Sequence, residues 1–461
     1  MKLNRSLGIS HKINDFKAGN ILGVLQKEFP MELLSNEETG DDKTRSRERV
    51  FTSATTLLTM VLTATQKDKS LKNSVQLYYT LHQQNKTRVM ESLKEQIQKE
   101  KEEDRKKGKR PGRPKQYAIQ IPESLKKDIS LNTAAYSKAR QRVSLELIKE
   151  LFSSTRIQEA ENDYTHFHGR KVFIGDGTYV QMQDTSSLRE LYDVKHHGDS
   201  FKGYPQGLVE VLIERGTGQV YTFRLSDRHT SELALFHDMI DEIPKGSVLL
   251  MDDLYNCFEI IAKCIRMGID LVIPAKREKD YELVEKISEG DFIIKKRTPK
   301  NRSKWLSEHE KPGCFLLRRI ECKSPDGKDY LIYTTMLDKT ISKDEIQLLY
   351  LTRWDVEVGI REIKTIMDIN ILRSKTPDMA LKELLVALAT YNLIRKVIYA
   401  SIKDLPFSPK EDFIFKFYTL NQDILVDKKG RVYNRWSTGR PRNEGVNYST
   451  DATDKKTEQE I

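Results

Sequence analysis

Cysteine is scarce in this 461-residue sequence, which contains four. Cys257, Cys264, Cys314 and Cys322 have no C-x-x-C spacing and no paired histidines near them. A structural zinc site needs clustered Cys and His ligands. The pattern therefore argues against a zinc site and predicts reduced thiols.

Long apolar runs are also absent. The best candidate, TLLTMVLTA at 56–64, is short and carries threonines, whereas a membrane-spanning helix needs about 20 apolar residues. The first residues, MKLNRSLGIS, contain no secretory hydrophobic region. We therefore expect a cytoplasmic protein with no membrane partner.

Acidic residues are too few to balance the basic ones. The chain has 68 Asp and Glu against 78 Lys and Arg, a net charge of +10. Such an excess favours a polyanionic partner where it is concentrated. It is concentrated at 105–115, where seven residues are basic and none is acidic.

Two short basic segments resemble AT-hooks, in which a Gly-Arg-Pro core is flanked by cations. They are KRPGRPK at 109–115 and, as an echo of it, TGRPRN at 438–443. A proline-stiffened backbone would let Arg113 enter a narrow A/T minor groove of DNA. A basic linker that touches phosphates without preference is the alternative. The other cations concerned are Lys109, Arg110, Lys115 and Arg440.

Hydrophobic periodicity divides the chain. The amino-terminal part has helical spacing, as in VSLELIKELF, whereas strand-like runs such as KVFIGDGTYVQM, GLVEVLIER and QVYTFRLS begin near 170 and then alternate with helices. A meander of three strands followed by alternating helix and strand is how a ribonuclease H sheet begins. The predicted regions are a helical DNA-binding region (1–165) with a basic linker (105–115), a core (166–275), a β-rich insertion (276–342), a second core part (343–405) and a basic tail (406–461).

Two apolar strands end on acidic residues. VFIGDGTYV carries Asp176, and GSVLLMDDLYN carries Asp252 followed by Asp253. Open α/β sheets bind ligands beyond the carboxyl ends of strands, so these acids are candidates for a metal or phosphate site. Only one residue of the Asp pair can face a shared site, because successive strand residues point to opposite faces. A phosphatase of the haloacid dehalogenase type is excluded, since Ile174 stands where its nucleophilic Asp would be.

The segment YLTRWDVEVGIREIK at 350–364 adds a third acid. On a helical wheel Tyr350, Arg353, Glu357 and Lys364 fall within one arc of about 60°. An adjacent apolar stripe, which includes Val356, would dock such a helix on the sheet. A solvated helix face with an Arg-Glu pair four residues apart is the alternative.

The order Y-x2-R-x3-E-x6-K resembles the signature of DDE transposases of bacterial insertion sequences, family four. The resemblance extends to IGDGT around Asp176 and to LLMDDLYN around Asp252, and covers about 170–402. Relatives usually carry Arg-Gly after the second Asp. Here Asp253 and Leu254 stand in those places, whereas Tyr255 is kept.

This resemblance implies an α/β protein with a ribonuclease H-like catalytic core, a β-rich insertion between the second Asp and the Glu, and an all-helical amino-terminal DNA-binding region. Asp176, Asp252 and Glu357 would hold two Mg²⁺ ions, for which Mn²⁺ can substitute. Tyr350, Arg353 and Lys364 would contact phosphates of the transposon end. Trp305, which follows a run of cations in the insertion, would hold a flipped base during hairpin formation.

The resemblance also implies a function. The protein would bind terminal inverted repeats of double-stranded DNA as a homodimer, cleave donor DNA by hydrolysis and join the 3′-hydroxyl ends to target DNA, in association with a bacterial nucleoid. One alternative is a transposon-derived DNA-binding protein without catalysis. Another is a structure-selective nuclease that shares the core but carries out no strand transfer.

Overall fold

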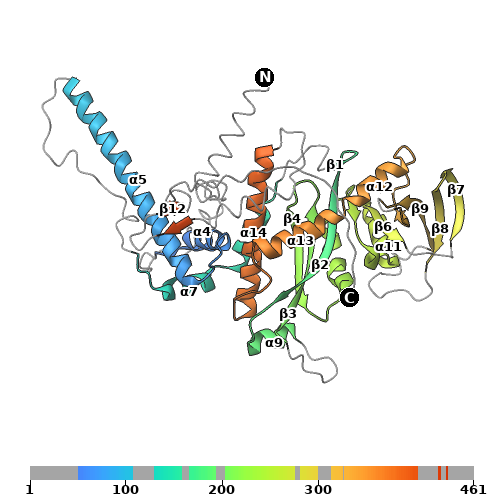
Figure 1. Ribbon diagram of the computed structural model, residues 1–461, viewed down its shortest axis with the longest axis horizontal. Helices are drawn as coiled ribbons and strands as arrows, with labels where there is room; N and C mark the ends of the chain where they lie inside the picture. Colours follow the sequence, from blue (N-terminus) through green and yellow to red (C-terminus); the bar gives the residue numbers. More distant parts are fainter. Residues whose placement is uncertain are drawn as a thin grey trace, which may run out of the picture.

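The computed structural model describes residues 50–106, 129–157, 166–193, 203–275, 281–298, 313–324, 327–402, 424–426 and 432–434. These residues form a mixed α/β structure in which helices pack around a large sheet (Figure 1). This confirms the α/β class expected from the sequence. Among these residues, no helix is both long and apolar enough to cross a membrane.

The sheet is built on a meander of antiparallel strands. β2 (Arg170–Gln181) pairs with β3 (Gln206–Glu214), and β3 pairs with β4 (Val220–Asp227). The short β1 (His166–Phe167) pairs with the start of β2. The meander that the sequence predicts from about 170 is therefore confirmed.

Two parallel strands continue the sheet on the other side of β2. β5 (Val248–Leu250) lies parallel to β2, and β6 (Asp270–Ala275) lies parallel to β5. Parallel strands are covered by helices on both faces and therefore read as continuous apolar runs. The run Val248–Leu250, which is fully buried, is one example. The predicted alternation of helix and strand after the meander is confirmed.

Alternate residues of the central strands enter two separate cores. Ile174 and Leu250 belong to one hydrophobic cluster, whereas Phe173, Leu249 and Met251 belong to the other. This alternation follows from the two-residue period of a strand. It decides which helices each polar side chain of the sheet will face.

Helices cover both faces. α10 (Glu232–Met239), the 3-10 turn η4 (Ile240–Glu242) and α11 (Phe258–Met267) supply Phe236, Ile240 and Ile261 to the core that contains Phe173. On the opposite face α13 (Trp354–Ile366) and α14 (Pro377–Ile402) supply Val356, Ile360 and Leu388 to the core that contains Ile174.

Four further strands extend the sheet beyond β6. They are β7 (Glu282–Ser288), β8 (Asp291–Arg297), β9 (Cys314–Lys323) and β10 (Asp329–Thr334). β10 pairs with β6 and also with β9, so the sheet continues in the order β6-β10-β9-β8-β7. The strands that occupy the predicted insertion therefore share one sheet with the core strands.

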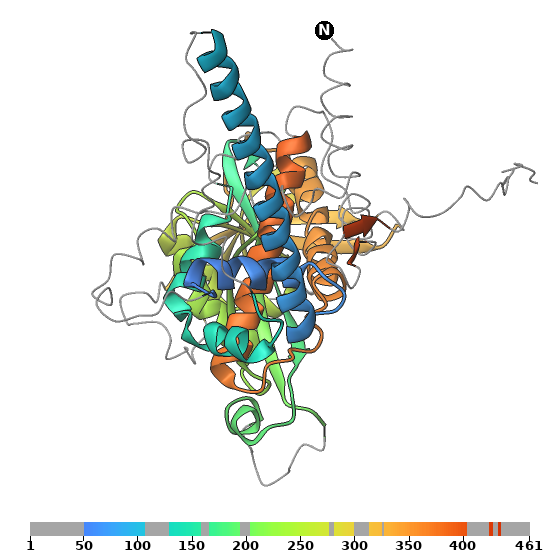
Figure 2. The same cartoon turned by 90° about the vertical axis from the view of Figure 1, so that its left-hand side faces the viewer.

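The amino-terminal helices pack against the end of the sheet. α4 (Ser53–Ala64), α5 (Leu71–Lys106), α7 (Thr133–Arg142) and α8 (Leu145–Ser154) follow one another along the chain. α4 and α8 contact α14, and their apolar residues join the core that contains Ile174. The far end of α5 projects away from the rest of the molecule (Figures 1 and 2). α9 (Ser186–Tyr192) lies beyond the end of β2.

The prediction of a single helix over 350–364 is wrong. α12 (Lys343–Leu351) ends before Thr352, and α13 begins at Trp354. At the junction the backbone bonds span three residues instead of four, as from Arg353 N–H to the Tyr350 carbonyl. The Thr352 hydroxyl donates to the Leu349 carbonyl at 2.6 Å. A side chain that bonds back to its own helix in this way commonly bends it.

Two short strands, β11 (Ile424–Val426) and β12 (Val432–Asn434), pair antiparallel within the segment that the sequence predicts to be a basic tail. The AT-hook-like segments at 109–115 and 438–443 lie outside the described residues, as does Trp305.

Candidate functional site

Asp176 lies in the middle of β2 and faces α13. The prediction that this strand ends at the acid and then turns is wrong, because the residues from Gly177 to Gln181 continue β2 and pair with β3. Ile174, two residues earlier, belongs to the core that α13 covers, and side chains two residues apart on a strand share a face. The Gly177 N–H donates to Oδ1 of Asp176 at 2.9 Å. The central strand thus presents one half-buried carboxylate toward the helix that carries Glu357.

The pKa of Asp176 shows which charges surround it. Burial raises this pKa, and the negative charges of Asp252 and Glu357 raise it further, against the lowering effects of the Gly177 N–H and the Arg353 charge. Repulsion of this kind falls off with distance. The three carboxylates predicted from the sequence therefore lie in one neighbourhood, although they come from β2, from the end of β5 and from α13.

Strand register favours Asp252 over Asp253. Ile174 of β2 is the partner of Leu250 of β5, and both belong to the core under α13. Asp252 stands two residues after Leu250 and keeps extended backbone angles, φ −85° and ψ −177°. It therefore continues the face that carries Asp176, whereas Asp253 begins the 3-10 turn η5 (Asp253–Tyr255). The Leu254 N–H donates to Oδ1 of Asp252 at 2.8 Å.

Glu357 stands in the first turn of α13 and is held by Arg353. Nη2 of Arg353 lies 3.0 Å from Oε1 of Glu357, and the Arg353 side chain is largely buried. Gly359 lies where α13 packs against the sheet. A Cβ at that position would lie 2.8 Å from Cδ1 of Ile213 on β3, so the end of the Ile213 side chain would have to move.

The other signature residues, Tyr350, Arg353 and Lys364, lie along α12, α13 and the junction between them. The pKa of Tyr350 is raised to about 12 by burial, while the charge and hydrogen bond of Arg353 act in the opposite direction. The Arg353 guanidinium also lies 4.9 Å from the ring centroid of Trp354, whose side chain is exposed. Lys364 is half-buried near the end of α13, and burial lowers its pKa.

The donor set fits a hard divalent cation. Carboxylate oxygens are the ligands that Mg²⁺ prefers, and the mutual repulsion of Asp176, Asp252 and Glu357 is what a bound cation would relieve. In the described part of the chain, however, no three Asp, Glu, His or Cys side chains are gathered closely enough to hold a metal ion. The ion pair that Glu357 makes with Arg353 turns one of these ligands toward a cation of the protein itself.

Sequence reasoning missed a second group of polar residues, on the opposite face of the sheet. Glu210 of β3 is fully buried, and the Tyr255 hydroxyl donates to its Oε1 at 2.7 Å. The Glu232 carboxylate packs against Gly177, where a Cβ would come within 2.6 Å of it. The signal was present in GLVEVLIE, a buried strand with an acid in its middle.

Several predicted DNA-binding residues lie outside the described residues: Trp305, Lys109, Arg110, Arg113, Lys115 and Arg440. Their roles stay predictions. The structure brings together Asp176, Asp252, Arg353 and Glu357 by electrostatic contact, with Tyr350 against Arg353.

Comparison with known proteins gives the same reading of this region. Residues 167–393 match the family model described as the transposase DDE domain. The chain is 27% identical to the transposase InsG for insertion sequence element IS4 of Escherichia coli K12 over 269 residues, which cover 57% of this chain and 60% of InsG. It is 26% identical to the putative transposase InsZ of the same organism over 160 residues, which cover 34% of this chain and 54% of InsZ. The chain thus spans little more than half of the length of either relative.

Among solved structures, the chain is similar to the piggyBac transposase in a synaptic complex with hairpin DNA. The TM-score is 0.37 at 8% identity, with 89% of this chain and 80% of that chain covered.

Proposed function

Because residues 167–393 of this chain form a transposase DDE domain, we propose that the protein is the transposase of a bacterial insertion sequence related to IS4. It would bind the inverted repeats at the element's ends, cleave the donor strands by hydrolysis and join the 3′-hydroxyl ends to target DNA. The observation that supports this proposal is the repulsion that Asp252 and Glu357 exert on Asp176, which helps to raise the pKa of Asp176.

The proposed fold is ribonuclease H-like. Strand order β4-β3-β2-β5-β6, with three antiparallel strands followed by two parallel ones, supports this assignment. The domain boundaries proposed with it are those predicted from the sequence: 1–165, 166–275, 276–342, 343–405 and 406–461.

In the proposed mechanism Asp176, Asp252 and Glu357 hold two divalent cations, which when bound would activate the attacking oxygen and stabilise the leaving oxygen. Arg353 holds Glu357 in place through its ion pair at 3.0 Å. With Tyr350 and Lys364 it also offers donors to the phosphates of the scissile strand. The chain's own side chains thus orient the strand and form no covalent intermediate with it.

Double-stranded DNA is the proposed partner, bound by a homodimer that pairs two element ends. The net charge of +10 supports a polyanionic partner. The same proposal includes excision through a DNA hairpin, in which Trp305 holds a flipped base. It also includes minor-groove contacts by Arg113 and Arg440.

The test is strand cleavage by the full-length chain on DNA that carries the element's ends, with Mg²⁺ or Mn²⁺ present. Asp176→Ala, Asp252→Ala and Glu357→Ala should each lower cleavage by more than about 100-fold, since loss of an outer-shell partner alone costs about 10- to 100-fold in metal sites. Binding of uncleaved ends should persist, because none of these side chains packs a core.

The matched control is Asp253→Ala, which should cleave near the wild-type rate. If Asp253→Ala abolishes cleavage while Asp252→Ala does not, the second acid is misassigned. If the wild-type chain binds the ends but never cuts them, the alternative of a non-catalytic DNA-binding protein takes its place.

A further inference from the structure

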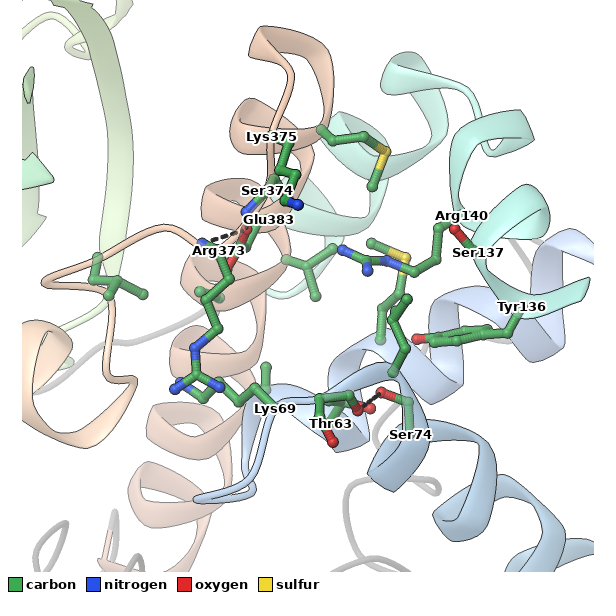
Figure 3. Close-up of a pocket in the computed structure, with 18 of the residues that line it drawn as sticks. Thr63, Lys69, Ser74, Tyr136, Ser137, Arg140, Arg373, Ser374, Lys375 and Glu383 are labelled. Carbon is green, nitrogen blue, oxygen red and sulfur yellow. Dashed lines mark hydrogen bonds between the residues drawn. The ribbon is translucent and has the colours of Figure 1, made fainter. Parts of the chain in front are cut away.

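A cavity of about 460 Å³ lies between the amino-terminal helices and the segment that joins α13 to α14 (Figure 3). Its walls come from α4, α5 and α7 on one side and from residues 367–387 on the other. None of the carboxylates Asp176, Asp252 and Glu357 lines it. The cavity is therefore separate from the site assigned to DNA cleavage.

Arg140 of α7 points into this cavity (Figure 3). Its Nε is buried and, within the described ranges, has no hydrogen-bond partner. The guanidinium lies 6.0 Å from the ring centroid of Tyr136, one turn earlier on the same helix. A buried donor without an acceptor destabilises the folded protein, more so when it is charged. Arg140 therefore has unused capacity to bind an anion.

Other cations line the same cavity, and they outnumber the acids. Lys69 donates to the Met367 carbonyl, and burial lowers the pKa of Lys69 to about 8. Arg373 pairs with Asp368 at 2.8 Å. Four cationic side chains face two acidic ones in the lining: Lys69, Arg140, Arg373 and Lys375 against Asp368 and Glu383.

Both acids of the lining are already engaged. Asp368 is paired with Arg373, and Glu383 accepts the backbone N–H groups of Arg373, at 3.0 Å, and Ser374, at 2.8 Å. Neither acid pairs with Arg140 among the residues that the structure describes. The positive charge of Arg140 is therefore left for a ligand.

The remaining wall is apolar and aromatic. It includes the thioethers of Met60, Met367 and Met379 and the ring of Tyr136, with the hydroxyls of Ser74 and Ser137 beside them. A cavity of this size suits a small molecule. Met and Tyr side chains pack against flat rings, whereas guanidinium and ammonium groups bind phosphate.

We propose that this cavity binds a nucleoside phosphate, with the phosphate at Arg140 and Lys69 and the base against the methionines. The ligand could be a nucleotide of a DNA strand or a free nucleotide, since both offer the same chemistry. The site goes beyond the proposed cleavage reaction and does not depend on its carboxylates.

The test is binding by the full-length chain, followed by calorimetry or fluorescence anisotropy, with two probes. Deoxyadenosine and thymidine 5′-monophosphates represent the free source, and a single-stranded 12-nucleotide DNA represents the strand. Arg140→Gln removes the cavity charge, and Arg142→Gln removes an exposed charge on the same helix that does not line the cavity. Arg140→Gln should weaken binding about tenfold or more relative to Arg142→Gln.

The binding measurements distinguish a free nucleotide from a nucleotide of a DNA strand as the ligand. Loss of mononucleotide binding in Arg140→Gln indicates a free nucleotide, and loss confined to the oligonucleotide indicates a DNA strand. Equal affinities for Arg140→Gln and Arg142→Gln with both probes, or no binding of either probe by the wild type, would overturn the proposal. Lys69→Gln, compared with Lys67→Gln, repeats the test at the other proposed phosphate ligand if Arg140→Gln fails to fold. Asp176→Ala should bind the probes as the wild type does, so that failure of cleavage and failure of this site remain distinguishable.

Discussion

Glu210 is the residue whose environment departs most from that of an ordinary acid. It is fully buried on β3, and its Oε2 has no hydrogen-bond partner within the described residues. Burial, together with the charges of Glu232, Asp176 and Asp252, raises its pKa to about 9, although the hydrogen bond from Tyr255 acts in the opposite direction. At neutral pH Glu210 is therefore protonated, and the Tyr255 hydroxyl bonds to a neutral carboxyl group.

A carboxyl group in this position makes stability depend on pH. Its pKa in the folded protein lies well above the ordinary value for a glutamate, so its contribution to stability is fully present below about pH 4.5 and is lost as the pH rises toward 9. Glu210→Gln, which mimics the neutral acid, should raise the free energy of unfolding at pH 8 by about 2 kcal/mol or more, since each pKa unit corresponds to about 1.4 kcal/mol. It should change stability little at pH 4.5.

Denaturant unfolding at both pH values measures this effect. Glu289→Gln, an exposed acid in the turn after β7, is the control and should leave the pH dependence unchanged. An unchanged pH dependence in Glu210→Gln would show that Glu210 is ionised in the folded protein.

At the scale of elements, the break between α12 and α13 determines how the signature residues meet. Tyr350 lies near the end of α12, whereas Glu357 and Lys364 lie on α13. Arg353 stands at the junction, where it reaches both Tyr350 and Glu357. The end of α12 and the start of α13, and not one continuous helix face, therefore bring Tyr350, Arg353 and Glu357 together.

Loss of a phosphate contact should change the salt dependence of DNA binding. Arg353→Ala and Lys364→Ala should each weaken binding to a cleaved element end and reduce the slope of log affinity against log salt by about one unit. Lys245→Ala is the control, because this exposed lysine precedes β5 at the end opposite Asp252. Titrations between 50 and 200 mM salt measure the slope, and unchanged slopes in both variants would mean that these cations contact no phosphate.

At the scale of the whole molecule, the strands between β6 and α12 separate Asp252 from Glu357 in the chain. Arg318 of β9 connects β8 to the segment that leads into α12. Its Nε and Nη2 lie 2.8 and 2.6 Å from the Asp291 carboxylate of β8. Its Nη1 donates to the carbonyls of Asp338 and Ile341, which lead into α12. This buried ion pair fixes the start of the segment that carries Glu357.

Removal of one partner leaves a charge buried without compensation. Asp291→Ala should therefore lower the free energy of unfolding by about 3–5 kcal/mol. Glu321→Ala, which removes the exposed partner of Arg319, should cost about 0–1 kcal/mol. Chemical denaturation of both variants makes the comparison, and equal losses would show that the Arg318 pair does not hold the two parts together.

Some of this protein can be predicted from sequence because its causes are local. Apolar runs before Asp176 and Asp252 predict strands there, and the strands β2 and β5 are found, although only β5 ends before its acid whereas β2 continues through Asp176 to Gln181. The signature around Glu357 identified the transposase resemblance, which the match of residues 167–393 to the transposase DDE domain confirms. Periodicity and residue order are properties of neighbouring residues, so no knowledge of distant contacts is needed.

Tertiary structure alone decided three other features. The break at Thr352 places α12 against β6 and α13 against β2, and helical periodicity does not show it. The apolar run GLVEVLIE indicates that Glu210 is buried, but the charges of Glu232, Asp176 and Asp252 that also raise its pKa come from other segments. The cavity of Arg140 joins residues more than 200 positions apart in the chain. Burial and electrostatic contact between distant segments exist only after the chain has folded, because they depend on which surfaces exclude water together.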